Sequence, residues 1–123
     1  MAILFVTHDL GLVGEIASRA LVMYAGEIVE EGPVRQILTR PRMPYTKALI
    51  ASRPHLRGEC RKIKAIPGTV PNLAALPQGC SFHPRCGFAV KGVCDRTAPA
   101  LQEVAEGWRV RCHRWREIEE AGA

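Results

Sequence analysis

ILFVTHDLGLVGEIASRALVMYAGEIVEEG, residues 3–32, is the stretch that decides the fold. Residues 3–6 carry no charge, which is typical of a strand covered on both faces in the parallel sheet of an α/β domain. Thr7, His8 and Asp9 follow at once. Function in such sheets collects at the carboxyl ends of the strands. We therefore predict an α/β fold, with His8 as the first candidate site residue.

The rest of the stretch predicts a helix and a hairpin. Residues 10–18 carry apolar side chains at helical spacing, and Asp9 stands where an N-cap is expected because its carboxylate can accept a backbone N–H. Residues 20–24 and 27–31 are separated by an Ala-Gly pair, and glycine suits a tight hairpin turn. The expected order is strand, helix and two-stranded hairpin.

Prolines set the expected pattern of the following chain. Segments 33–40 and 44–52 each begin with a proline, whose missing N–H costs nothing in the first turn of a helix, so both are predicted to be helical. Pro54 should end the second of them. Between residues 54 and 100, prolines and glycines predict turns and extended chain. Residues 114–121 favour a final helical turn or two.

Composition narrows the classes of function. The chain has 123 residues and a net charge of +5, with basic residues concentrated in the tail from residue 53 on, yet only 6% of its residues are aromatic. No nucleic-acid motif accompanies the charges, so we interpret them as a solvated surface and rank a nucleic-acid binder third. No run approaches the roughly 20 apolar residues of a membrane span, and no signal-peptide pattern is present. A cytoplasmic location is the simplest expectation, and there cysteines are thiols or metal ligands rather than disulfides.

Several motifs resemble one known family. LFVTHDL followed by ASRALVMYAGEIVEEGPV resembles the switch-histidine region of the ATP-binding subunits of ABC transporters, in particular those of oligopeptide/dipeptide importers. PYTKALIASRP, IPGTVPNLAALPQGC, FHPRC and VRCH resemble the C-terminal extension of the same subunits. The resemblance covers nearly the whole chain. It implies that residues 1–42 are the C-terminal part of a P-loop ATP-binding domain and that residues 43–123 are a loop-rich, cysteine-containing extension.

The motifs that complete such an ATPase are not in this sequence. A glycine-rich phosphate loop, a signature motif and an aspartate-glutamate pair are all missing. We therefore expect the chain to be a fragment that alone neither binds nor hydrolyses ATP appreciably, because nothing would cradle the phosphates. Its open sheet edge predicts poor solubility in isolation.

The resemblance assigns His8 a catalytic role. It implies that His8 is the switch histidine, which reaches the γ-phosphate of ATP bound with Mg²⁺ between two ATP-binding subunits and helps to orient the attacking water. An imidazole suits this task, since one ring nitrogen can donate while the other accepts. The tripeptide THD alone is common, and its alternative interpretation is a loop histidine satisfied by the backbone.

The resemblance also implies partners and a location. The intact protein would pair with a second ATP-binding subunit, bind two membrane permeases, and serve a solute-binding protein indirectly, with no role for nucleic acid. It would act at the cytoplasmic face of the cell membrane and couple ATP hydrolysis to uptake of peptides or similar solutes. The alternative function, from another class, is a stand-alone metal-binding module with a regulatory or interaction role.

Four cysteines form the second candidate site. They are spaced C-x(5)-C-x(7)-C-x(17)-C and Cys60 stands outside the pattern; the four are Cys80, Cys86, Cys94 and Cys112. Their thiolates could hold a 4Fe-4S cluster or a tetrahedral zinc ion, and either would stabilise a short, proline-rich segment. The absence of a C-x(2)-C knuckle favours iron-sulfur, and the resemblance implies the same. Zinc, with His83 or His113 replacing a thiol, and a site without metal remain open alternatives.

Overall fold

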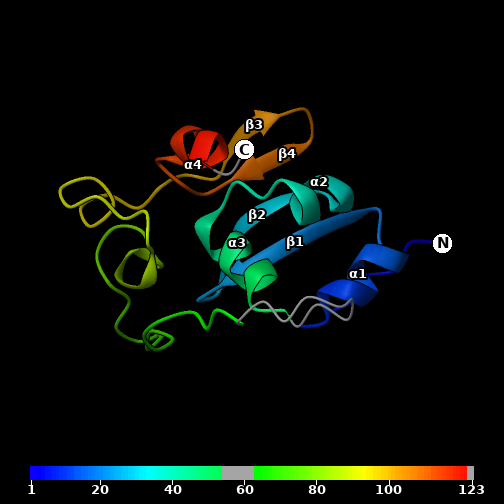
Figure 1. Ribbon diagram of the computed structural model, residues 1–123, viewed down its shortest axis with the longest axis horizontal. Helices are drawn as coiled ribbons and strands as arrows, with labels where there is room; N and C mark the ends of the chain where they lie inside the picture. The colour runs from blue at the N-terminus through cyan, green and yellow to red at the C-terminus, as the bar shows by residue number, and fades with distance from the viewer. Residues whose placement is uncertain (54–62, 122–123) are drawn as a thin grey trace.

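The computed structural model describes residues 1–53 and 63–121, which build one small α/β unit around an antiparallel sheet (Figure 1). The sheet has the order β1-β2-β4-β3. In Figure 1, α1 lies beside one end of β1, and α4 lies beside the β3-β4 hairpin. The helices are α1 (Leu10–Ile16), α2 (Val34–Thr39), α3 (Pro44–Ala51) and α4 (Trp115–Ala121), with a 3-10 turn η1 (His83–Arg85); the strands are β1 (Arg19–Tyr24), β2 (Glu27–Pro33), β3 (Gln102–Ala105) and β4 (Trp108–Val110).

The β1-β2 hairpin forms as the sequence predicts. Its turn residues Ala25 and Gly26 both have positive φ, 49° and 79°. Turns of this kind match the right-handed twist of the flanking strands, which is why glycine is favoured there. Val22 and Tyr24 face the core, whereas Leu21 and Met23 of β1 point outward and are exposed.

A second hairpin, β3-β4, was not predicted. Its strands are joined at Gly107, which has a φ of 65°, and β4 pairs with β2 through Glu30↔Val110 and Glu31↔Arg109. Trp108 and Val110 are buried. One continuous sheet therefore contains residues from both sides of the predicted division at residue 42.

Glu30 connects the two hairpins. Its carboxylate is fully buried and its Oε1 accepts hydrogen bonds from Trp108 Nε1 at 3.0 Å and from the backbone N of Arg42 at 2.9 Å. Its Oε2 accepts one from the backbone N of Met43 at 3.3 Å. These three donors offset part of the cost of burying a charge. Burial nevertheless raises the pKa of the Glu30 carboxyl.

Arg42 extends this polar cluster to the last helix. Its guanidinium lies 4.3 Å from the Trp108 ring centre and 5.1 Å from that of Trp115, so it is held between two indoles. The same group forms an ion pair with Glu119 of α4, with Nη2 and Oε1 2.6 Å apart. Strand β4 and helix α4 are thereby fixed to the segment that precedes α3.

An aromatic cluster packs residues 80–85 against the first hairpin. The ring centres of Tyr24, Tyr45 and Phe82 lie 4.6 to 5.3 Å apart, and the Tyr24–Phe82 pair meets edge to face at 82°. Edge-to-face pairs are a favoured aromatic geometry. Residues far apart in sequence thus share one core.

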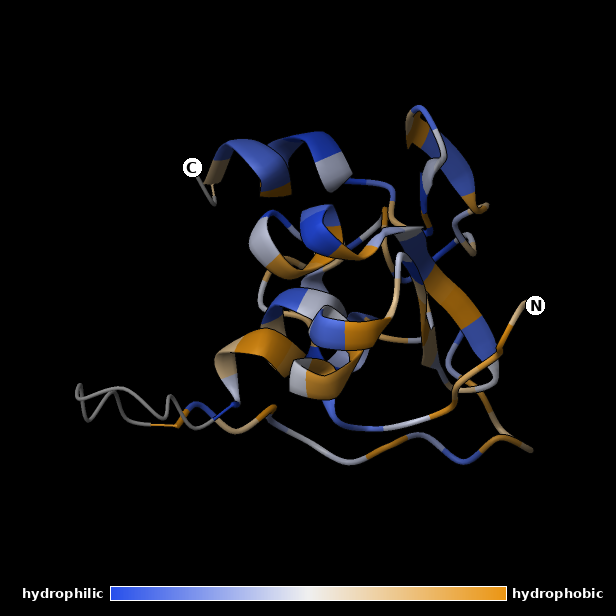
Figure 2. Cartoon of the chain, turned by 90° about the vertical axis from the view of Figure 1, so that its right-hand side faces the viewer, coloured by the Kyte–Doolittle hydropathy of each residue, from blue (hydrophilic) through white to orange (hydrophobic). Residues whose placement is uncertain are grey.

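The prediction of a strand at residues 3–6 is wrong. This segment forms no strand in the described structure, and its side chains are exposed, with Leu4 at 85% and Val6 at 89%. In Figure 2 the amino-terminal segment is an apolar coil at the margin of the molecule. A strand needs a neighbour for its backbone groups, and none of the described strands lies beside this segment. The sheet among the described residues is antiparallel, and the parallel sheet expected around residues 3–6 is not formed by them.

The helix predictions are confirmed with shifted bounds. Helix α1 ends at Ile16, two residues earlier than expected, and Asp9 caps it as predicted. Pro33 ends β2 and caps α2 instead of forming its first turn, whereas Pro44 begins α3. Pro54, expected to end α3, lies outside the described residues. No helix in the described ranges is long and apolar enough to cross a membrane.

The raised pKa of Glu30 predicts a specific pH dependence of stability. A carboxyl whose pKa is higher in the folded than in the unfolded chain stabilises the fold most at pH values below its unfolded pKa. This stabilisation is lost as the pH rises through the pKa of the folded chain. In Glu30→Gln the amide oxygen still accepts hydrogen bonds but cannot ionise. We expect the free energy of unfolding of the parent chain, relative to this variant, to decrease between pH 4 and pH 8.

Urea denaturation of both chains across this pH range measures the difference. The other titrating groups are common to the two chains, so their contributions cancel in the comparison. Parallel pH profiles would contradict the role given to Glu30.

Candidate functional site

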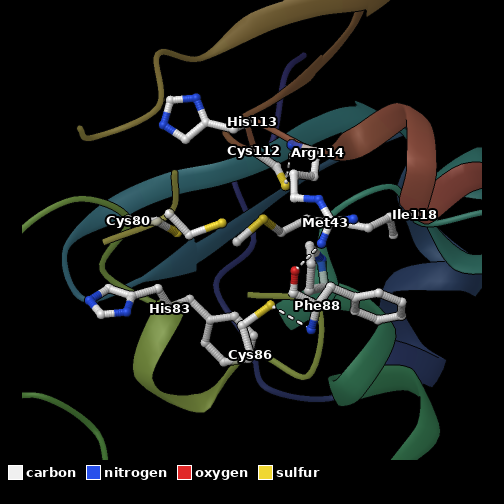
Figure 3. A pocket seen from close by; sticks show the side chains of 12 residues that line it. Met43, Cys80, His83, Cys86, Phe88, Cys112, His113, Arg114 and Ile118 are labelled. Carbon is white, nitrogen blue, oxygen red and sulfur yellow. Dashed lines mark hydrogen bonds between the residues drawn. The ribbon is translucent and has the colours of Figure 1, made fainter. Parts of the chain in front are cut away.

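The four predicted cysteines line a single cavity (Figure 3). Cys80 precedes η1, Cys86 follows it, and Cys112 follows β4. Figure 3 shows the side chains of these three cysteines around that of Met43. The remaining lining residues are mostly apolar; the full set is Met43, Pro44, Cys80, Phe82, His83, Cys86, Phe88, Cys94, Cys112, His113, Arg114 and Ile118.

Backbone hydrogen bonds hold Cys80 and Cys94 side by side. The N–H of Cys80 donates to the carbonyl of Cys94 at 2.8 Å, and the N–H of Cys94 donates to the carbonyl of Val90 at 2.9 Å. Gly79 is required at this point, because its φ is 82° and a Cβ there would collide with the Cys94 carbonyl oxygen. The loop carrying Cys94 is thus folded back onto Cys80.

The sheet positions Cys112. The residue before it, Arg111, donates its backbone N–H to the carbonyl of Val29 at 2.8 Å and its Nε–H to the carbonyl of Ile28 at 2.9 Å. Both acceptors belong to β2. Cys112 is therefore anchored to the strand that also carries Glu30.

Backbone N–H groups point at three of the sulfur atoms. Phe88 N lies 3.4 Å from Cys86 Sγ, Val90 N lies 3.5 Å from Cys94 Sγ, and Arg114 N lies 3.4 Å from Cys112 Sγ. Such donors favour the thiolate over the thiol. They are also among the features that tune iron-sulfur clusters.

Burial acts in the opposite direction. It raises the pKa of the Cys80 and Cys86 thiols and raises the pKa of Cys112 to about 12, with the neighbouring cysteines adding to each shift. The four cysteines are free thiols. A metal would have to displace their protons, since thiolates are the ligands.

The arrangement of donors does not form a single-ion site. Within residues 1–53 and 63–121, no group of three or more His, Cys, Asp or Glu side chains is placed so that it could hold a metal ion. His83 and His113 line the cavity, but His113 Nε2 lies 2.7 Å from the carbonyl oxygen of Thr97 and is engaged with the backbone. Cys60 lies outside the described residues.

His8 lies in a separate place. It is exposed, between the amino-terminal coil and α1, and it does not line the cysteine cavity. Its neighbours are fixed: Asp9 N donates to Thr7 Oγ1 at 3.0 Å, and Asp9 Oδ1 accepts from the backbone N of Gly11 at 2.8 Å. His8 is therefore an exposed residue next to the capped start of α1.

Sequence reasoning did not find three of the residues that complete the cavity wall. Met43 precedes α3, Arg114 precedes α4, and Ile118 lies within α4. Only Arg114 had a local signal, because it stands two positions after Cys112. The others reach the cysteines through tertiary packing.

Comparison with known proteins gives matches over most of the chain. Residues 29–94 match the family model described as "Oligopeptide/dipeptide transporter, C-terminal region". A Brucella ovis protein, provisionally named a peptide import ATP-binding protein, is 52% identical over 96% of this chain and 36% of its own length. The dipeptide transport ATP-binding protein DppD of Escherichia coli is 41% identical over 92% of this chain and 34% of its own length. The chain thus spans about a third of the length of these relatives.

The raised pKa of Cys112 predicts slow alkylation of this thiol in the metal-free chain. At pH 8 a pKa of about 12 leaves roughly one thiolate in 10⁴, against about a quarter for an ordinary cysteine near 8.5. We expect iodoacetamide to alkylate Cys112 at least about 10³-fold more slowly in the folded chain than in urea. Mass spectrometry of peptides from a time course measures this ratio.

Denatured chain supplies the control, because all cysteines should then react at similar rates. Equal rates for Cys112 in the folded and unfolded chain would contradict the buried, protonated state.

Proposed function

The chain belongs to the family of oligopeptide/dipeptide transporter C-terminal regions, and from this premise we propose that it serves as the C-terminal part of the ATP-binding subunit of a peptide importer. The similarity to peptide import ATP-binding proteins over more than nine-tenths of the chain is the observation that carries the proposal. Residues 1–42 would complete the ATP-binding domain, and residues 43–123 would form its extension. ATP and Mg²⁺ would be bound mainly by parts of the subunit outside this chain.

We assign His8 to the γ-phosphate of ATP. Its exposure and the hydrogen bond from Asp9 N to Thr7 Oγ1, between its two sequence neighbours, support this role, because a donor must be aimed at the phosphoryl oxygens without reorganising during the reaction. The apolar coil at residues 3–6 would be covered by parts of the subunit outside this chain. Its exposed apolar side chains are consistent with such a covering.

The partners follow from the same proposal. A second ATP-binding subunit would close the nucleotide site across from His8, and two membrane permeases would anchor the pair at the cytoplasmic face of the membrane. A solute-binding protein would deliver a peptide or similar solute to the permeases. The chain would contribute to the energy-coupling step.

We propose that Cys80, Cys86, Cys94 and Cys112 hold an iron-sulfur cluster. The donor set fits this group, since four thiols line one otherwise mostly apolar cavity and backbone N–H groups point at three of the sulfurs. A tetrahedral zinc ion would need its sulfurs about 3.8 Å apart, given a Zn–S distance of about 2.3 Å. A four-iron cluster is larger than one ion and holds its ligands farther apart. When bound, the cluster would supply one-electron redox chemistry and cross-link the loop-rich segment.

Substitution of the equivalent of His8 tests the catalytic assignment. In a full-length relative that carries this segment, His8→Ala should lower ATP turnover by about 10²–10³-fold, because one preorganised donor to the phosphoryl group is lost. Nucleotide binding should be nearly unchanged. Steady-state ATPase assays and equilibrium binding of a fluorescent ATP analogue measure the two quantities.

The matched control is Glu15→Ala, which changes an exposed residue of the adjoining helix. This variant should retain turnover. Full activity in His8→Ala would remove the assignment.

The proposed iron-sulfur cluster is tested by the iron and sulfide content of the chain and by its visible absorption. Chain purified without oxygen and reconstituted with ferrous iron and sulfide should bind iron and sulfide in equal amounts and absorb broadly in the visible range. Cys112→Ala should lose the cluster, whereas Cys60→Ala, outside the spacing pattern, should keep it. Elemental analysis, sulfide assay and absorption spectra measure these outcomes.

A colourless chain with one equivalent of zinc would overturn the choice of iron-sulfur. A chain that takes up neither metal would overturn the metal site itself.

A further inference from the structure

Arg114 is the one permanently charged side chain among the described residues that line the cysteine cavity. The other lining residues are cysteines, histidines and apolar residues. A guanidinium keeps its charge at every physiological pH. The side chain is 28% exposed, so its charge is only partly screened by water.

The contacts of Arg114 reach two cysteine-bearing segments (Figure 3). Its backbone N lies 3.4 Å from Cys112 Sγ. Its Nη1 donates to the carbonyl oxygen of Phe88 at 2.5 Å, and the N–H of Phe88 points at Cys86 Sγ at 3.4 Å. One side chain therefore links the loop after Cys86 to the segment after Cys112.

The remaining contact of Arg114 is an ion pair with a partly exposed carboxylate. Its Nε donates to Glu117 Oε2 at 2.9 Å, and the Glu117 side chain is 59% exposed. Exposed ion pairs are weak because water competes with them. Lys47, the nearby lysine, donates instead to the carbonyl of Ile118 at 2.7 Å and does not line the cavity.

A metal group on four thiolates would create a charge problem in this cavity. Four thiolates carry more negative charge than a divalent ion or an oxidised four-iron cluster neutralises. A net negative charge in apolar surroundings is costly unless a positive charge or hydrogen-bond donors lie close to it. Three backbone N–H donors point at the sulfurs, and the side chain of Arg114 lines the same cavity.

We propose that Arg114 compensates the negative charge of the group bound by the four cysteines and thereby sets its reduction potential. This inference rests on the proposed metal site. Reduction adds one negative charge to the group, so a nearby positive charge favours the reduced form. Arg114 would act as a positioning residue through charge and through its link to Phe88, without being a ligand.

The test compares reduction potentials of chains reconstituted with ferrous iron and sulfide. Arg114→Met should lower the equilibrium constant for one-electron reduction about tenfold, which corresponds to a shift of about 59 mV toward more negative potential. Arg114→Lys keeps the charge and should remain near the parent value. Arg116→Met is the matched control, because it removes the same charge from an exposed position of α4. Dye-mediated redox titration followed by electron paramagnetic resonance measures each potential.

The outcomes separate this inference from the metal site on which it rests. If the parent chain binds no cluster, the metal site is wrong and the inference is overturned with it. If the parent chain is loaded and Arg114→Met has the parent potential, the inference alone is overturned. If Arg114→Met cannot hold the cluster, a loaded Arg114→Lys with the parent potential supports charge compensation. Loss of the cluster in both variants, with Arg116→Met loaded, would make Arg114 a structural clamp and overturn the inference.

Discussion

The buried carboxylate of Glu30 is the constraint on which the architecture depends. It sits on β2, the strand that both hairpins share, and its donors come from β4 and from the turn before α3. A buried charge that lost one of these donors would cost about 1–3 kcal/mol, more than an exposed ion pair contributes. Trp108 can approach closely only because residue 32 is glycine, since a Cβ there would lie 2.8 Å from the indole. The second hairpin is thus placed by a polar contact as much as by apolar packing.

Local chemistry made the first half of the fold predictable. The β1-β2 hairpin follows from an Ala-Gly turn, α1 from the capping carboxylate of Asp9, and α3 from Pro44 in its first turn. The β3-β4 hairpin was missed for two reasons. Its strands are very short, and it is stabilised by pairing with β2, about 80 positions earlier in the chain. Glu30 was missed for the second of these reasons. The sequence alone shows a charged residue of a strand, whereas the fold gives it buried partners in Trp108 Nε1 and the backbone N–H of Met43.

Residues 3–6 show a different kind of error. Their apolar pattern is local, but the neighbouring strand that it requires is not among the described strands. An uncharged apolar run indicates that a segment prefers to be buried, but a strand forms only where a neighbouring strand satisfies its backbone hydrogen bonds.

The cysteine spacing was a more reliable guide. It identified four residues that do line one cavity, whereas Met43 and Ile118 could not be found, because tertiary packing brings them there. Spacing reports which residues can be ligands, and packing decides what surrounds them.

Two features of the fold act in opposite directions on the pKa values of the cavity thiols. Burial raises the pKa of Cys80, Cys86 and Cys112, whereas backbone N–H donors and the charge of Arg114 favour thiolates. The apolar wall that produces the first effect includes Met43, whose backbone N–H is also bonded to Glu30. Met43 therefore joins the cavity wall to the buried carboxylate of β2. The cysteine site and the sheet junction are thus neighbouring parts of one packed unit that share Met43.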